Sequence, residues 1–301
     1  MIRYLGNNEI DRVRWDGCIG SCQGVRPYGY SWYLDIMSPG WSALVEGDYE
    51  SLFPIPGLRK YGIQYVSTPV FLQQLGVFSP GMHTTGIINR FLDLIPKHFR
   101  LIDLCVGQEV KNENYKVTQR TNYELDLSCS YEANWQKFSS GCRKNIKKSI
   151  SENPEIIYDV KASELITLFR SNKGREIKEI NSLSYQRLEN LMNYCVENRR
   201  GRIIGVRDSE GKLIFGRFLL EHGARIVTLF TANTSESRNR KIGYFVINEL
   251  IKEFSSTRTI LDFEGSSIPP IASFMESFGC TRVPFYRIYR NSLPWPIRYF
   301  K

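Results

Sequence analysis

A weak internal repeat is the feature that most limits how this chain can fold. Residues 73–107 and residues 227–265 both run as an extended segment, a polar loop, a helix with a glycine near its start, and an apolar strand that carries an aspartate. A pattern of this length that occurs twice predicts two duplicated domains, because a solenoid needs three or more shorter units. The matching residues are Gly86 with Gly243 and Asp103 with Asp262.

The region before the second copy predicts an antiparallel meander. Residues 202–207, 212–220 and 225–232 are apolar segments, and the turn residues Asp208-Ser209-Glu210-Gly211 and Glu221-His222-Gly223-Ala224 separate them. Short apolar runs bounded by such turns are typical of neighbouring strands.

The second copy itself predicts a parallel crossover. Residues 242–254 place apolar side chains at the 3.6-residue spacing of a helix, and residues 259–263 form a short apolar run typical of a buried strand. A strand, a helix and a strand in this order form a right-handed crossover between parallel strands. A short helix opened by Pro269 and a half-buried strand at 282–290 complete this half.

The N-terminal half repeats the order more loosely. Residues 30–37 and 41–46 read as paired strands, 64–78 as an extended apolar segment, 84–99 as a helix, and 101–106 as a buried strand. We place the boundary near Ser128, after a strand at 115–127, which gives an N-terminal domain at 1–128 and a C-terminal domain at 129–301. The expected fold class is α+β, with a mixed, mostly antiparallel sheet flanked by helices in each domain.

Composition and charge bound the location and the partners. No apolar run approaches the roughly 18 residues of a membrane helix, and the seven cysteines are odd in number and scattered, which is typical of reduced thiols in the cytoplasm. Only three histidines are present, so no metal site is expected. The net charge of +9 favours anionic partners. Basic clusters at 143–148, 199–202 and 238–241 fit phosphate or RNA contacts, and they fit solvated helix ends equally well.

The order of elements resembles the GNAT acyltransferase core, and two such halves in one chain resemble the Fem-type (FemABX) aminoacyl transferases. The stretches LDLSCSYEANWQKFSSGCRKNIKKS (125–149) and LDFEGSSIPPIASFMESFGC (261–280) carry the resemblance. It implies transfer of an acetyl or aminoacyl group from an activated donor to an amine. It also implies an acyl-CoA or an aminoacyl-tRNA as that donor.

The resemblance implies a donor-phosphate loop at the start of the second crossover helix. The superfamily pattern is Arg/Gln-x-x-Gly-x-Gly/Ala. The segment Arg240-Lys241-Ile242-Gly243-Tyr244-Phe245 matches its first four places and departs from it at Phe245. Backbone amides at a helix N-terminus bind phosphate, and glycine permits a close approach. The N-terminal half has Gly86 without an arginine, so that half is expected to be degenerate. The expected donor-binding residues are Thr231, Arg238, Arg240, Lys241, Ile242 and Gly243.

Glu264 and Tyr286 are the expected catalytic residues. Glu264 follows the second parallel strand, where ligands of such crossovers gather, and its carboxylate would take a proton from the attacking amine. A cap or a surface carboxylate is the simpler interpretation of Glu264. Many GNAT enzymes place a tyrosine as general acid where this chain has Met275, and a thioether cannot donate a proton. Tyr286, on the last strand, is the replacement we consider, against ordinary packing.

The acceptor is expected to contact Trp32, Gln73, Gln74 and Arg143. Gln73 and Gln74 interrupt an apolar segment, so one of them faces inward and needs a partner. The acceptor itself is left open as a small-molecule amine or a cell-envelope precursor, with transfer RNA as a further partner.

Three hypotheses stay open from the sequence. The leading one is an acyl-CoA-dependent transferase. The second is an aminoacyl-tRNA-dependent Fem-type enzyme acting on a cell-wall precursor. The third is a non-catalytic binding protein of GNAT fold, in which Phe245 and Met275 would fill the cleft.

Overall fold

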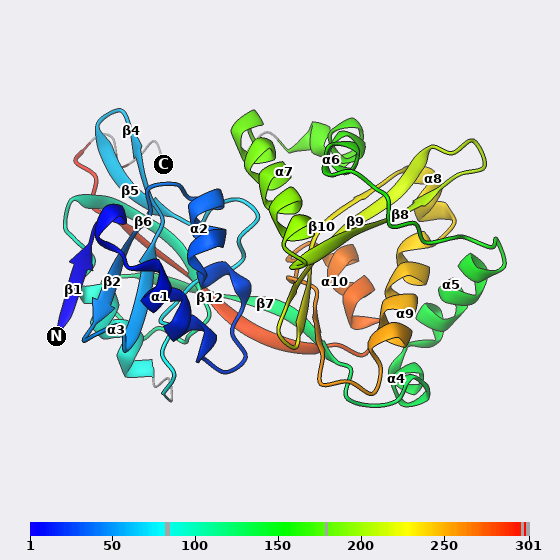
Figure 1. The fold of residues 1–301 in the computed structure, drawn as a ribbon, viewed down its shortest axis with the longest axis horizontal. Helices are drawn as coiled ribbons and strands as arrows, with labels where there is room; N and C mark the ends of the chain where they lie inside the picture. The colour runs from blue at the N-terminus through cyan, green and yellow to red at the C-terminus, as the bar shows by residue number, and fades with distance from the viewer. Residues whose placement is uncertain (82–84, 178–179, 296–297, 299–301) are drawn as a thin grey trace. The chain divides into compact units, whose positions relative to one another are not determined.

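The computed structural model describes residues 1–81, 85–177, 180–295 and 298, and divides the chain into two compact units (Figure 1). Unit 1 consists of Met1–Arg120 and Pro284–Lys301, and unit 2 of Thr121–Val283. The chain passes from one unit to the other within β7 (Lys116–Asp126) and again within β12 (Thr281–Asn291). The boundary expected near Ser128 lies just after β7, and most of the last strand is counted with unit 1.

Unit 1 contains a small antiparallel sheet and a mixed sheet. The small sheet has the order β1-β2-β3, and the mixed sheet contains β4, β5, β6 and β12 in that order. Strands β5 and β6 are parallel with α3 between them in the chain, while β12 runs antiparallel to β6. The bounds are β1 (Ile2–Leu5), α1 (Arg12–Gly20), α2 (Ser31–Met37), β2 (Ser42–Glu46), β3 (Ser51–Ile55), β4 (Gly57–Lys60), β5 (Ile63–Ser67), α3 (Thr85–Asp93) and β6 (Phe99–Val106).

The strand predicted at residues 30–37 is wrong, because these residues form the helix α2. Its buried side chains include Tyr33, Leu34 and Met37, and their spacing of three and four residues is helical. The segment 64–78 is also less regular than expected. Beyond β5 it contributes only single bridges, from Leu75 to Val106 and from Phe78 to Leu52.

Unit 2 builds a sheet with the order β7-β11-β10-β9-β8. Only β10 and β11 are parallel, with α9 between them in the chain. Helices α6 and α7 pack on one face of the sheet, and α5 and α9 pack together on the other (Figure 1). The bounds are α4 (Tyr131–Lys137), α5 (Ser140–Ile150), α6 (Ala162–Ser171), α7 (Ser182–Glu197), β8 (Gly201–Arg207), β9 (Leu213–His222), β10 (Arg225–Asn233), α8 (Ser235–Asn239), α9 (Ile242–Phe254), β11 (Ile260–Asp262) and α10 (Pro269–Glu276).

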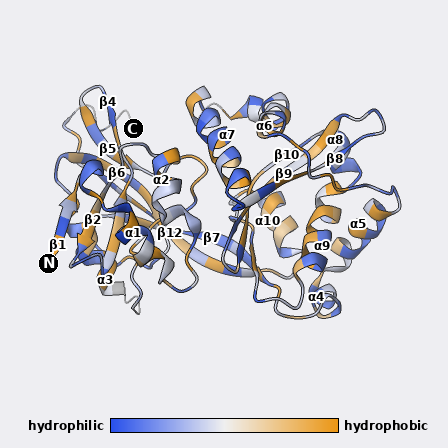
Figure 2. Cartoon of the chain, in the orientation of Figure 1, coloured by the Kyte–Doolittle hydropathy of each residue, from blue (hydrophilic) through white to orange (hydrophobic). Residues whose placement is uncertain are grey.

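The predicted fold class is confirmed: mixed sheets are flanked by helices, and a parallel crossover occurs in each unit. Apolar side chains of α9 and α10 form one buried cluster with the sheet of unit 2, and both helices show hydrophobic residues in Figure 2. On the opposite face Gly216 of β9 admits Leu165 of α6, because a Cβ at this glycine would lie 2.6 Å from Leu165 Cδ1. No helix in the described residues is both long enough and apolar enough to span a bilayer.

A buried charge network ties three strands of unit 2 together. Asp262 of β11 is fully buried, and its Oδ2 lies 2.6 Å from Arg225 Nη1 of β10. Arg225 Nη1 also lies 2.9 Å from Glu124 Oε1 of β7, and Asn122 Nδ2 donates to Asp262 Oδ1 at 2.9 Å. The backbone N–H of Glu264 donates to the same Oδ1 at 3.0 Å. Asp262 therefore has the structural role that its place inside the strand predicts.

We expect Asp262→Ala to lower the free energy of unfolding by about 3 kcal/mol, because it leaves the buried Arg225 with Glu124 alone. The matched control is Asp48→Ala, which removes the ion pair with Arg14, whose two side chains are 51% and 65% exposed. The control should change stability by less than about 1 kcal/mol. Urea unfolding followed by circular dichroism measures both, and equal effects would contradict the assignment.

Candidate functional site

The parallel ladder of unit 2 is short, because β11 ends at Asp262 while β10 continues. The ladder between β10 and β11 runs from Arg225 opposite Ile260 to Val227 opposite Asp262. Strand β10 continues to Asn233, and its pairing with β9 shifts register between Val227 and Phe230. In the described residues, β11 makes no pair with β10 beyond Val227. Residues 228–233 of β10 therefore have backbone groups on this edge available for a ligand.

The N-terminus of α9 lies at the carboxyl end of β10 and has two backbone donors to spare. Its N-cap, Lys241, is left-handed with φ 59°, and the N–H groups of Tyr244 and Phe245 donate to the Lys241 carbonyl at 2.9 and 3.4 Å. No hydrogen bond donated by the N–H of Ile242 or Gly243 is found in the described part of the chain. These donors and the helix dipole favour an anion at this end.

Gly243 is not required by packing. A Cβ at this position would lie 3.8 Å from the rings of Phe215 and Phe274, which is an ordinary van der Waals contact. Its φ is not among the positive values of the chain. The glycine instead leaves the backbone of the first turn bare, as a ligand that approaches the amides closely needs.

The basic residues before α9 differ in how their charge is compensated. Arg240 Nε lies 2.6 Å from Glu152 Oε2 and its Nη1 lies 3.1 Å from Glu236 Oε1; the hydrogen bond to Glu152 is the main reason that the pKa of Arg240 is raised. Arg238 Nη1 donates to Asn233 Oδ1 at 2.6 Å. No ion pair of Arg238 or Lys241 occurs within the described ranges. The charge of Arg240 is thus balanced by two carboxylates, whereas Arg238 and Lys241 have no carboxylate at ion-pair distance among the described residues.

Glu264 is held in a strained turn at the carboxyl end of β11. It is partly buried and left-handed, with φ 61°, and the following Gly265 is left-handed too, with φ 63°. A Cβ at Gly265 would lie 2.2 Å from the Thr121 carbonyl oxygen, so only glycine fits. A non-glycine residue in this conformation costs about 1–3 kcal/mol and is enriched at functional sites.

The predicted acid Tyr286, and Met275 at the usual place of that acid, lie on elements other than β10, β11 and α9. Tyr286 lies opposite Val106 in the sheet of unit 1, whereas Glu264 belongs to unit 2. Met275 is buried in the apolar core of unit 2.

The predicted acceptor residues are divided between the units. Trp32 of α2 packs on Tyr33, with ring centroids 5.6 Å apart, and Gln74 Nε2 donates to Gln73 Oε1 at 2.5 Å. These three predicted residues are in unit 1. Arg143 lies on α5 in unit 2, next to Lys144 and one turn before Lys147, and α5 packs on α9.

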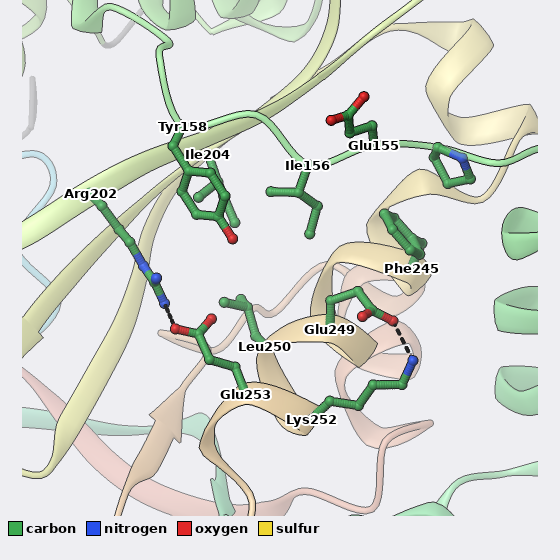
Figure 3. A pocket seen from close by; sticks show the side chains of 11 residues that line it. Glu155, Ile156, Tyr158, Arg202, Ile204, Phe245, Glu249, Leu250, Lys252 and Glu253 are labelled. Atoms are coloured by element: carbon green, nitrogen blue, oxygen red, sulfur yellow. Dashed lines mark hydrogen bonds and ion pairs between the residues drawn. The ribbon is translucent and has the colours of Figure 1, made fainter.

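A groove of about 590 Å³ lies between α9, β8 and residues 154–158 (Figure 3). Its cations already have carboxylate partners: Arg202 pairs with Glu253 at 2.8 Å, and Lys252 pairs with Glu249 at 2.7 Å. Glu155 adds a further negative charge, so the groove does not suit phosphates. The ring of Phe245 lines this groove and is also partly buried against the apolar core of unit 2.

A second groove, of about 400 Å³, lies within unit 1. Asp103 and Arg287 form a bidentate pair across it, with both distances 2.6 Å, and this bond raises the pKa of Arg287. Sequence reasoning identified Asp103 through the repeat, but it missed Arg287. The alternation of the last strand, which puts Arg287 and Tyr289 on one face, was the available signal. The remaining lining residues are Tyr65, Val66, Ser67, Leu101, Lys116 and Thr118.

The order of elements and the two parallel crossovers define a tandem GNAT-type fold. Comparison with solved structures confirms this fold. The chain is similar to FemX, with a TM-score of 0.64 and 12% identity over 94% of this chain and 96% of that one.

Two further solved structures share the fold. L-PGS from Bacillus licheniformis has a TM-score of 0.54 and 12% identity, with 95% of this chain and 94% of that chain covered. A tandem GNAT protein from the clavulanic acid biosynthesis pathway has a TM-score of 0.52 and 13% identity, with 98% and 99% covered. No family model and no curated protein matches the sequence.

We expect Gly243→Ala to leave the protein as stable as the wild type or to stabilise it by about 0.5–1 kcal/mol, because the added methyl group has room and alanine favours the helix. The matched control is Gly265→Ala, which places a Cβ 2.2 Å from a carbonyl oxygen and should lower the melting temperature. Differential scanning calorimetry compares the two. A comparable loss of stability in Gly243→Ala would show that this glycine is structural.

Proposed function

We propose that the chain is a cytoplasmic N-acyltransferase whose donor binds at the corner formed by β10, β11 and the N-terminus of α9. The observation that supports this most is the end of the β10–β11 ladder at Val227, beside a helix start with two spare amides and a glycine that packing does not need. All seven cysteines are free thiols, which suits a reducing compartment.

The donor's phosphates would bind at the amides of Ile242 and Gly243, with Lys241 and Arg238 supplying positive charge. Arg240 is a weaker candidate, because Glu152 and Glu236 already neutralise it. The acyl carbonyl would lie along the free edge of β10 near Thr231, where backbone N–H groups stabilise the developing oxyanion.

Glu264 would accept the proton of the attacking ammonium, directly or through a water. A free amine with a solution pKa near 10 is mostly protonated at neutral pH, so a base at this point raises the fraction of nucleophile. The buried Met275 cannot serve as the acid. The assignment of Tyr286 as the acid stays a prediction, and binding of the donor and removal of the proton use residues of unit 2 alone.

An acyl-CoA, such as acetyl-CoA, is the donor we favour, because the corner offers a compact set of backbone amides and cations that can bind its phosphates. An aminoacyl-tRNA donor is the second candidate, and its support is the basic side of α5. Arg143, Lys144, Lys147 and Lys148 lie on this helix, and none of them forms an ion pair within the described residues. The acceptor would be a small amine in the first case and a cell-envelope precursor in the second.

The donor is tested by thermal shift with coenzyme A, acetyl-CoA and bulk tRNA at two salt concentrations. At one hundred times its dissociation constant, a ligand stabilises the protein by about 2.7 kcal/mol. We expect acetyl-CoA to stabilise the wild type, and Gly243→Ala, with its fold intact, to need at least tenfold more ligand for the same shift. A shift with tRNA alone that falls steeply with salt would favour the second donor. No shift with any ligand would favour the non-catalytic binding protein.

The role of Glu264 is tested by Glu264→Gln, which keeps the shape of the side chain. Loss of a general base typically lowers kcat about 10²- to 10⁴-fold, and the KM for the donor should not change because donor binding does not use this carboxylate. Glu210→Gln, in the exposed turn between β8 and β9, is the control and should retain full activity. A wild-type kcat in Glu264→Gln would remove Glu264 from the mechanism.

A further inference from the structure

Arg217, in the middle of β9, is a buried cation without a counter-charge. The residue is only 5% exposed, and its Nε and Nη1 are enclosed with no hydrogen-bond partner. Within the described residues it forms no ion pair either. Burial is the sole cause that lowers its pKa to about 10.

The surroundings of Arg217 are almost entirely apolar. Its cross-strand neighbours are Ile204 of β8 and Thr231 of β10. Phe215 and Leu219, two residues away on either side along β9, share its face and belong to the core beneath α9. The guanidinium carbon lies 5.6 Å from the centre of the Phe215 ring, and this cation–π contact offsets only part of the desolvation.

Two neighbours of Arg217, Phe215 and Thr231, connect it to the donor corner. The Phe215 ring beside its guanidinium is the ring that approaches Gly243, at 3.8 Å from the position of a Cβ there. Thr231, opposite Arg217, is on the part of β10 that has no partner in β11 among the described residues. Thr231 is also partly exposed, so solvent reaches this face one residue away from the arginine.

Arg225, a buried arginine with a structural role, differs from Arg217 because carboxylates neutralise its charge. Arg225 is also buried in the sheet of unit 2, and it has Asp262 at 2.6 Å and Glu124 at 2.9 Å. A buried charge is tolerated when it is paired, and Arg217 has no pair inside the described part of the protein. The missing negative charge is therefore expected from a ligand.

We infer that Arg217 is a ligand-binding residue of the donor corner. Its guanidinium would bind a phosphate or carboxylate group of the ligand, which enters beside Thr231 beneath the first turn of α9. The inference rests on the proposed function for the place of the donor, and it adds a recognition residue that the loop motif does not contain. Because the pair would be shielded from solvent, binding should depend less on salt than contacts to the exposed basic clusters do.

The test compares the wild type with Arg217→Met and Arg217→Lys. The probes are coenzyme A, pyrophosphate and N-acetylglycine. The readouts are the melting temperature and the dissociation constant from calorimetry. Both are measured at 50 and 300 mM salt, where the Debye length is about 14 and 6 Å. Arg217→Met should melt higher than the wild type without ligand, because it removes an unpaired buried charge. It should also bind the stabilising probe at least tenfold more weakly, while Arg217→Lys retains part of the affinity.

The matched control is Arg202→Met on the neighbouring strand β8, whose arginine pairs with Glu221 at 2.9 Å and Glu253 at 2.8 Å. This variant should not melt higher, and it should bind the probes as the wild type does.

The outcomes separate this inference from the proposed function. Equal binding of coenzyme A by the wild type and Arg217→Met would overturn the role of Arg217 and leave the acyl-CoA proposal standing. Stabilisation by pyrophosphate or N-acetylglycine, but not by coenzyme A, that is lost in Arg217→Met would support Arg217 and remove coenzyme A as donor. Absence of a shift with all three probes in the wild type would overturn the inference.

Discussion

The pairing of Asp262 with Arg225 is the interaction on which the candidate site depends. It joins the ends of β10 and β11 where the two strands still form a ladder, and the same aspartate accepts the N–H of Glu264. The ladder ends at Val227 and Asp262, and among the described residues β10 continues without β11 beyond this pair. A single buried carboxylate thus binds both the cation that links the strands and the backbone N–H of the proposed base.

Three arginines of unit 2 show how one residue type takes different roles according to its surroundings. Arg225 is buried with two carboxylates and holds strands together, and Arg240 is tied to Glu152 and Glu236 near the surface. Arg217 is buried with neither. Each of these arginines adds one positive charge to the net charge of the sequence. The free-energy cost of burying that charge, however, depends on whether a carboxylate lies within about 4 Å.

Local periodicity predicted most of unit 2 but less of unit 1. The meander, the helix α9 and the short strand β11 match the expected segments within one or two residues, because each has a strong repeat of apolar side chains and clear turn residues. The strand prediction for residues 30–37 failed because a segment this short fits strand alternation and helical spacing almost equally well. Pairing of β12 with β6 depends on contacts between residues far apart along the chain, for example Asp103 with Arg287 at a separation of 184.

The candidate site shows the same division between local and long-range information. The glycine at 243 and the glutamate at 264 follow from a motif and a strand end, which are local signals. The balanced charge of Arg240 and the unpaired charge of Arg217 depend on which side chains the fold brings near them, so no pattern along the chain reveals either.

The passage of the chain through β7 and β12 makes unit 2 an insertion within unit 1. During synthesis the residues of unit 2 leave the ribosome before the strand that completes the mixed sheet of unit 1 exists. One edge of β6 therefore stays unpaired until β12 has been synthesised. Such an edge is prone to pair with other chains, so the order of assembly, with the inserted unit closing first, exposes the first-made segment to aggregation for longest.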